Sequence, residues 1–176
     1  MPAYQIKGLS GTGKTAIGRE LARRGYRVID TDAEFGCYAN LETEEPVEFP
    51  QTGHPSQEWY QTNGWMWDRA KVQATLNGMG SEAVFLCGGS LNEQHFYPRM
   101  ATIFRLYTEP RMLRDRLLKR HDRHSSNPVF VRRMLDLVEP YRMDAIGLGW
   151  PVIDTSERTV EQSADEILGY VHRSDR

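Results

Sequence analysis

The chain has 176 residues, of which 39% are hydrophobic and 26% charged, and its formal net charge is −2. This length predicts a single folded domain, and the balanced composition argues against disordered, fibrous and strongly basic nucleic-acid-binding classes. Because no apolar run comes near the roughly 18 residues of a membrane span and the chain starts without a signal segment, we expect a cytoplasmic protein with no membrane or nucleic-acid partner.

The hydrophobic pattern predicts strands and helices in alternation. Short apolar segments predict five strands, at residues 4–7, 26–30, 83–87, 101–107 and 151–154. Helical signals cover residues 14–24, 56–76 with a break near Asn63, 109–120, 129–145 and 160–172. Residues 33–55 carry no clear periodicity and are expected to form a loop or a small hairpin. This alternation predicts an α/β fold with a five-stranded parallel sheet covered by helices on both faces.

A glycine-rich segment directly follows the first predicted strand. Residues 8–15 read GLSGTGKT and match the phosphate-binding pattern G-x-x-x-x-G-K-[ST] at every fixed position. With a strand before it and a helix after it, backbone N–H groups and the helix N-terminus can surround phosphate oxygens. We therefore expect a P-loop NTPase-type three-layer sandwich. The predicted nucleotide contacts in this segment are Gly8, Ser10, Gly11, Thr12, Gly13, Lys14 and Thr15.

Two residues of this segment carry charge and metal chemistry. Lys14 is suited to bridge the β and γ phosphates as a compact cation, and we predict a catalytic role for it. The hydroxyl of Thr15 is suited to coordinate Mg²⁺. The expected cofactors are therefore ATP and Mg²⁺.

Two carboxylates end the second predicted strand. Asp30 and Asp32 are two residues apart, so both leave the strand end on one side, at the sheet edge where open α/β sheets bind ligands. Phosphoryl transfer to a hydroxyl needs a group that organises the metal and a group that orients and deprotonates the acceptor. We assign the metal shell to Asp30 and the acceptor base to Asp32.

These features, in this order, resemble the group of P-loop proteins that contains shikimate kinases, gluconate kinases and nucleoside or nucleotide kinases. The resemblance covers most of the chain. It rests on the P-loop, the Asp30-Thr31-Asp32 element, the Cys87-Gly88-Gly89-Ser90 turn, an arginine-rich lid and Ile153-Asp154-Thr155 after the fifth strand. It implies the same fold and a kinase activity.

The resemblance also implies roles for single residues. Gly88 and Gly89 match a glycine turn that touches the acceptor, and Thr155 falls in the nucleotide site. Arg120 matches an arginine that packs on adenine. A second arginine that contacts phosphates falls on Asn127, so Arg123 within the lid is the candidate to replace it. We therefore predict catalytic roles for Arg120 and Arg123.

The acceptor side departs from shikimate kinases. The position of one carboxylate-binding arginine is occupied by Trp67, and that of a second by Leu137 or Val138. Shikimate is therefore not the expected substrate.

The predicted acceptor-binding insertion, about residues 33–80, is rich in aromatic and acidic residues. From Val28 to Asp68 there is no Lys or Arg. Aromatic faces suit stacking on a ring or holding an amine, whereas an anion is ordinarily held by arginine. The sequence therefore favours a neutral or cationic hydroxyl acceptor, such as a nucleoside, a sugar or an amino sugar. The predicted acceptor contacts are Asp32, Phe35, Trp59, Trp67, Arg69, Gly88 and Gly89.

A lid over the phosphates is expected at about residues 116–128, where Arg116, Arg120 and Arg123 can neutralise the transferred phosphoryl group. The predicted function is an ATP-dependent phosphotransferase that moves the γ-phosphate to a small hydroxyl acceptor. Two alternatives stay open: a nucleoside monophosphate kinase, and a nucleotide-dependent switch or ATPase with a protein partner. Either a monomer or a homodimer is compatible with the sequence.

Overall fold

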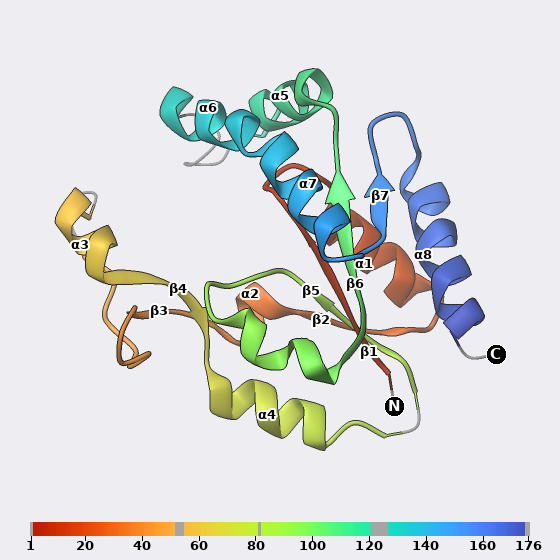
Figure 1. Ribbon diagram of the computed structural model, residues 1–176, viewed down its shortest axis with the longest axis horizontal. Coiled ribbons are helices and arrows are strands. Elements are labelled where there is room, and N and C mark those ends of the chain that lie inside the picture. Colours follow the sequence, from red (N-terminus) through yellow and green to blue (C-terminus); the bar gives the residue numbers. More distant parts are fainter. Residues whose placement is uncertain (1, 52–54, 81, 121–126, 175–176) are drawn as a thin grey trace.

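The computed structural model describes residues 2–51, 55–80, 82–120 and 127–174. Its central sheet has five strands, all parallel, in the order β2-β5-β1-β6-β7 (Figure 1). The strands of this sheet are β1 (Ala3–Gly8), β2 (Arg27–Asp30), β5 (Val84–Cys87), β6 (Met100–Tyr107) and β7 (Val152–Asp154). The five strands expected from the sequence are confirmed, each within a residue or two of its predicted bounds.

A second, two-stranded antiparallel sheet pairs β3 (Gly36–Asn40) with β4 (Asn63–Trp67). The helices that follow the P-loop and β2 are α1 (Lys14–Arg23) and α2 (Thr31–Glu34). Those between the hairpin and β6 are α3 (Gln57–Thr62), α4 (Arg69–Asn77) and the 3-10 helix η1 (Glu93–Arg99). The remaining helices are α5 (Pro110–Leu118), α6 (Pro128–Asp136), α7 (Val138–Gly147) and α8 (Val160–Ser174). No helix of the described residues has the length and apolar character needed to cross a bilayer.

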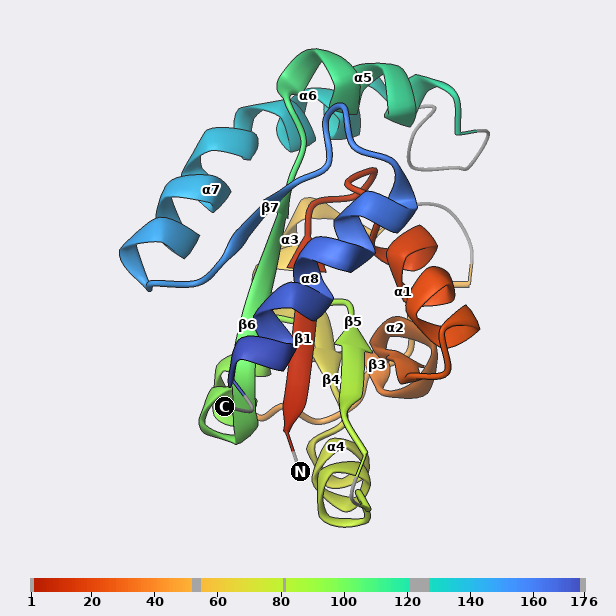
Figure 2. The same ribbon diagram turned by 90° about the vertical axis from the view of Figure 1, so that its right-hand side faces the viewer.

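Helices cover both faces of the central sheet. Figure 2 shows α1 and α8 lying side by side on one of these faces. Their residues Ile17, Leu21 and Ile167 pack with Ile6 and Phe104 of the strands in one buried cluster. On the opposite face, α4 and η1 supply a second apolar cluster. The sheet is therefore buried on both faces, which explains why its strands read as nearly continuous apolar runs.

Strand β1 positions two polar residues inside the protein. Successive side chains of a strand alternate between the faces of a sheet. Tyr4 and Ile6 enter the core with α1 and α8, whereas Gln5 and Lys7 face η1, where both bond to Glu93. The side chains of Gln5 and Lys7 are thus held, together with Glu93, inside the protein near the carboxyl ends of the strands.

Helices α5, α6 and α7 arch over the carboxyl end of β6 (Figure 1). Leu113 and Leu117 of α5 pack with Val131 of α6, Val138 of α7 and Leu9 of the P-loop in a third cluster. The inward positions predicted for Leu113 and Leu117 are confirmed, since both are fully buried. This cluster fixes the helices that follow β6 to the phosphate-binding loop.

Two sequence predictions about helices are corrected. The helical signal expected over residues 56–76, with a break near Asn63, is two helices, and the break is a full strand, β4. Ser56 and Asp68 each cap a new helix, and the Trp65-Met66-Trp67 run pairs with β3 because aromatic residues favour strands. The helix expected over residues 129–145 is also two helices, α6 and α7, because Pro140 has no N–H to continue the hydrogen bonding of α6.

Candidate active site

The P-loop is shaped by two glycines with positive φ angles. Gly11 has φ 88° and Gly13 has φ 100°, a region that other residues rarely adopt. A Cβ at Gly11 would also lie 2.9 Å from Cδ1 of Leu113, so α5 packs tightly against the loop. The buried Thr12 hydroxyl donates to the Leu9 carbonyl over 2.8 Å and closes the turn. The sequence pattern thus forms a compact loop at the start of α1.

The Lys14 ammonium lies over this loop. Its Nζ donates to the carbonyl oxygens of Gly8 at 2.8 Å and Leu9 at 3.1 Å. Burial lowers the pKa of Lys14. The negative charge of Asp32 raises this pKa in part, and the positive charge of Arg120 lowers it further. Lys14, Asp32 and Arg120 therefore share one electrostatic environment, which brings together three of the residues predicted to be catalytic.

Asp32 follows β2 and faces the hairpin. Its Oδ1 accepts a hydrogen bond from Nε1 of Trp65 over 3.3 Å. Burial raises the pKa of Asp32, whereas the Trp65 hydrogen bond and the Lys14 charge lower it. A carboxylate with a raised pKa, held by a directional donor beside a cation, has the properties of a general base.

The donor set beside the loop fits Mg²⁺. Thr15 is exposed at the first turn of α1, and Asp30 lies at the carboxyl end of β2, close enough to interact with Lys14. Asp30 uses Oδ1 to cap α2, accepting from the backbone N–H groups of Asp32 and Ala33 at 3.1 and 3.4 Å. Mg²⁺ in nucleotide sites takes one or two protein oxygens and completes its shell with phosphates and water. The hydroxyl of Thr15 and the second carboxylate oxygen of Asp30, which is not used in the cap, meet that need.

Thr155 lies beneath the P-loop. It is buried, and its hydroxyl contacts the carbonyls of Thr12 and Tyr107 at 3.0 Å each and the hydroxyl of Thr108 at 2.8 Å. Arg116 donates from Nη1 to the same hydroxyl over 3.1 Å. The structure therefore places Thr155 and Arg116 in a network that supports the loop, where sequence reasoning gave them nucleotide and phosphoryl contacts.

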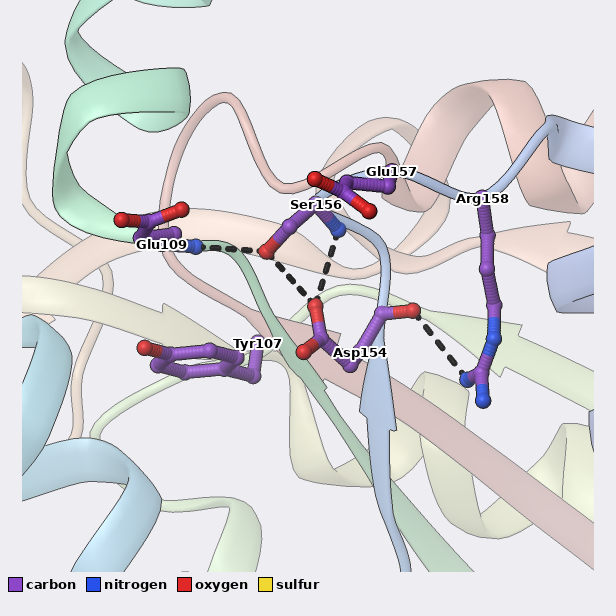
Figure 3. Close-up of a pocket in the computed structure, with 6 residues that line it drawn as sticks. All are labelled: Tyr107, Glu109, Asp154, Ser156, Glu157 and Arg158. Carbon is purple, nitrogen blue, oxygen red and sulfur yellow. Dashed lines mark hydrogen bonds between the residues drawn. The ribbon is translucent and has the colours of Figure 1, made fainter.

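A cavity of about 520 Å³ opens beyond this network, between the ends of β6 and β7 (Figure 3). Tyr107, Glu109, Asp154 and Arg158 contribute to its walls. Ser156 connects its two sides, because its hydroxyl accepts from the Glu109 N–H at 2.8 Å and donates to Asp154 Oδ1 at 2.6 Å. The loop after β7 is thus held against the start of α5.

The Arg120 side chain is exposed and reaches the P-loop, where Nη1 donates to Oγ of Ser10 over 3.0 Å. This contact places a guanidinium at the outer rim of the phosphate cradle. Residues 121–126 of the predicted lid, among them Arg123, lie outside the described residues.

A second cavity, of about 270 Å³, lies on the other side of the cradle. It brings together Gly8, Lys14, Asp32 and Gly89, which the sequence predicted. Gly88, which was also predicted to contact the acceptor, precedes Gly89 but does not line the cavity; its φ is 142°, and a Cβ there would lie 2.0 Å from Oγ1 of Thr31. Glycine is therefore required for the close approach of this turn to α2.

Four other predicted acceptor residues are not brought to this cavity. Phe35 and Trp67 are 4% and 1% exposed, and they pack in the core with α4, so their expected acceptor contacts are corrected. Trp59 packs edge-on against Tyr38, and Arg69 lies 3.6 Å from a carboxylate oxygen of Glu44. Of the described aromatic residues in the predicted acceptor-binding insertion, only Phe35 and Trp67 are buried, whereas the others are half-buried or exposed: Tyr38, Phe49, Trp59, Tyr60 and Trp65.

Several other residues that line the same cavity were not among the predicted site residues. They include Lys7, Trp65, Glu93, Arg105 and Tyr141. The available signal was a charged residue inside each of two apolar strands, Lys7 in β1 and Arg105 in β6. Glu93 gave no such signal, because only the tertiary fold brings η1 beneath β1.

A five-stranded parallel sheet whose first strand runs through a G-x-x-x-x-G-K-T loop into a helix defines a P-loop nucleotide-binding protein. The chain belongs to the AAA-domain family, since the model of that family, described as an AAA domain, matches residues 5–133. A comparison with curated proteins finds no significant match.

Several solved structures share the fold over nearly the whole chain. A gluconokinase from Sinorhizobium meliloti 1021 is 17% identical, with a TM-score of 0.54 over 98% of this chain and 92% of that chain. A shikimate kinase from Acinetobacter baumannii is 21% identical, with a TM-score of 0.56 over 98% and 94%. A deoxyadenosine kinase from M. mycoides is 14% identical, with a TM-score of 0.58 over 97% and 99%. At these identities the likeness is one of fold.

Proposed function

We propose that the protein is an ATP-dependent phosphotransferase that moves the γ-phosphate of ATP to a hydroxyl group of a small acceptor. One observation carries the proposal: a single cavity is lined by Lys14 of the phosphate cradle and by Asp32, the candidate base. Donor and acceptor groups would therefore meet without crossing bulk solvent. The kinase names of the structurally similar proteins are consistent with this reading.

In this proposal the P-loop amides and Lys14 hold the triphosphate. Thr15 and Asp30 hold Mg²⁺, which neutralises charge on the β and γ phosphates when bound. The cavity next to Ser156 takes the nucleoside end, and Arg120 covers the phosphates from the rim.

Asp32 acts on the acceptor. Its carboxylate accepts the proton of the acceptor hydroxyl as that oxygen forms a bond to the γ phosphorus. The bond from the γ phosphorus to the β–γ bridging oxygen breaks, and ADP leaves. Trp65 holds the carboxylate in place through its indole N–H. The Gly88-Gly89 turn, where backbone approaches closely, forms the adjacent wall.

The lid over residues 116–128, the acceptor-binding insertion over residues 33–80, the role of Arg123, a cytoplasmic location and a monomeric or homodimeric state remain predictions. A nucleoside monophosphate kinase and a partner-stimulated ATPase remain the alternatives.

The experiment measures transfer of the γ-phosphate from ATP, with Mg²⁺, to panels of nucleosides, nucleotides, sugars, amino sugars, polyols and hydroxy acids. We expect transfer to at least one compound and a loss of about 10²-fold or more in kcat for Asp32→Asn. Asp136→Asn, an exposed carboxylate of α6, is the matched control and should leave kcat unchanged. ATP hydrolysis that ignores every compound and also ignores Asp32→Asn would refute the proposal.

A further inference from the structure

Two cations lie side by side in the floor of the acceptor cavity. Lys7 of β1 and Arg105 of β6 are direct neighbours in the parallel register, and both line the cavity. They are 7% and 2% exposed. Cations are rarely buried to this extent unless they are paired, so the partners of each one decide what the floor can bind.

The Lys7 charge is compensated within the protein. Its ammonium pairs with Glu93 and lies 3.0 Å from the Tyr97 hydroxyl. Glu93 is fully engaged by this contact and by neutral donors, among them Nε2 of Gln5 at 2.6 Å and the Ser90 N–H at 3.3 Å. Glu93 therefore has little capacity left for Arg105.

The Arg105 charge is compensated poorly. Among the described residues its one carboxylate contact is Nη2 to Asp144 at 3.3 Å. The Asp144 side chain is 59% exposed, so water screens that pair. Within the described residues, Nε and Nη1 have no hydrogen-bond partner. Burial lowers the pKa of Arg105, which is the direction expected when a cation loses its hydration and nearby negative charges do not fully compensate for that loss. A buried guanidinium with unsatisfied N–H groups needs an explanation, and a bound ligand that accepts hydrogen bonds from those groups would provide one.

The surroundings of Arg105 leave a route for such a ligand. The guanidinium stacks on the ring of Tyr141 at 4.5 Å and lies 5.6 Å from the ring of Trp150. Tyr141 is 38% exposed, and both Tyr141 and Arg105 line the same cavity, so the stacked guanidinium borders space that a ligand can enter. The planar group is thus held in one orientation between rings, as bidentate recognition of an oxyanion requires.

The charges that line the cavity divide into two groups. Lys14 and Asp32 belong to the transfer chemistry. At the other end, Lys7 and Arg105 supply two positive charges and Glu93 is the carboxylate that lines the cavity beside them, so the lining carries an excess of one positive charge, which the exposed Asp144 screens from outside the lining. Asp32 follows β2 and Arg105 lies on β6, three strands further along the sheet, which is roughly 14 Å. A small metabolite can span from one group to the other.

We propose that the acceptor is an anionic hydroxyl compound, whose hydroxyl meets Asp32 and whose carboxylate or phosphate is received by Arg105 beside Lys7. This inference rests on the proposed function and revises the expected neutral or cationic acceptor. That expectation came from the absence of Lys and Arg between Val28 and Asp68, whereas β1 and β6 lie outside that stretch and supply the cations.

The first test measures thermal stabilisation with the P-loop saturated by Mg²⁺ and a non-hydrolysable ATP analogue, so that an added anion reports on the acceptor cavity. The probes are gluconate against sorbitol, glycerate against glycerol, and glycerol 3-phosphate against glycerol, at equal ionic strength. At least one anion should stabilise the protein where its neutral match does not. The carboxylate and phosphate arms tell which oxyanion is preferred. Equal shifts within every pair would overturn the inference.

The second test uses variants. Arg105→Gln should abolish the difference between anion and alcohol, and should reduce kcat/KM for an anionic acceptor by about tenfold or more. Arg105→Lys keeps the charge and should retain part of the preference, which covers the case in which Arg105→Gln does not fold. Arg19→Gln, on the exposed face of α1, should match the parent protein. A folded Arg105→Gln variant that keeps the full preference would overturn the inference.

The two proposals fail separately. Transfer to neutral alcohols with no preference for anions would leave the phosphotransferase in place and remove the anionic acceptor. ATP turnover that ignores all acceptors and Asp32→Asn would remove the phosphotransferase, whereas the stabilisation by anions is measured without any transfer.

Discussion

The indole Nε1 of Trp65 donates to Oδ1 of Asp32 over 3.3 Å and so connects the hairpin strand β4 to the carboxylate that follows β2. The contact depends on Gly36, because a Cβ there would lie 2.2 Å from Cζ2 of Trp65. In the proposed function, Asp32 of α2 is the base, and the hairpin orients it through this hydrogen bond.

Trp65→Phe removes the hydrogen bond and retains most of the ring. Since that bond holds the pKa of Asp32 down against burial, its loss should raise the pKa further. The acid limb of the pH profile of kcat for phosphate transfer should move to higher pH. Trp59→Phe, on the neighbouring helix α3, is the control and should leave the limb in place, because the indole that donates to Asp32 is that of Trp65. An unmoved limb in Trp65→Phe would show that the indole does not tune the base.

Gly36→Ala should disturb the same contact from the opposite side. The added methyl group has no room beside the indole, so the ring must shift, and overpacking of this kind destabilises by about 1–3 kcal/mol. Denaturant unfolding measures the loss, and kcat should fall with it. Gly147→Ala, near the end of α7 with no atom within 4 Å of the new Cβ, should be neutral or slightly stabilising. Equal effects at both glycines would contradict the packing argument.

Arg120→Ala should reduce kcat far more than ATP affinity, by about 10²-fold, because the guanidinium at the loop rim is suited to charge that grows during transfer. Steady-state kinetics together with calorimetric ATP binding separate the two effects. A large loss of ATP affinity with unchanged kcat would assign Arg120 to ground-state binding instead.

Arg116→Met should behave differently, although Arg116 lies one helical turn before Arg120. Its guanidinium bonds to the hydroxyl and carbonyl of Thr155 and the carbonyl of Ser156, beneath the P-loop. Its removal leaves buried acceptors with fewer donors, so the free energy of unfolding should fall by about 1–3 kcal/mol and the KM for ATP should rise. Unchanged stability and KM, with only kcat reduced, would instead assign Arg116 to the transferred phosphoryl group.

Glu20→Gln should weaken the contact between α1 and α8. Glu20 accepts from Arg23 and Arg24, and Arg24 also pairs with Asp165 of α8. Hydrogen bonds from Arg23 and Arg24 lower the pKa of Glu20 from 4.5 to about 2. A lowered pKa stabilises the fold above the unfolded value, and that stability is lost as pH falls through the folded value.

The free energy of unfolding of Glu20→Gln should therefore lie below that of the parent protein at neutral pH, and the difference should shrink as pH falls from about 4.5 towards about 2. Urea titrations across this range measure it. Glu58→Gln, an exposed carboxylate of α3, should show no such trend. A difference that stays constant with pH would assign the effect of Glu20 to packing.

Much of the fold could be predicted from local patterns. The P-loop, the apolar strands and the glycine stops are short-range signals, because backbone conformation and burial of a central strand depend on neighbouring residues. The hairpin was less accessible: β4 looked helical until its pairing with β3 was known. Strand formation there depends on a partner strand far along the chain, as in the pair of Tyr38 and Trp65, which are 27 residues apart, and no local pattern contains that information.

The sequence by itself determined the phosphate cradle, from Gly8 to Thr15, and the carboxylates of Asp30 and Asp32 at the sheet edge. Only the tertiary structure decided what surrounds them. Parallel pairing set Lys7 beside Arg105, packing of η1 brought Glu93 to Lys7, and folding of the hairpin turned Trp65 towards Asp32 while burying Trp67. Charge compensation and burial depend on groups distant in sequence, so the character of the acceptor site is a property of the folded chain.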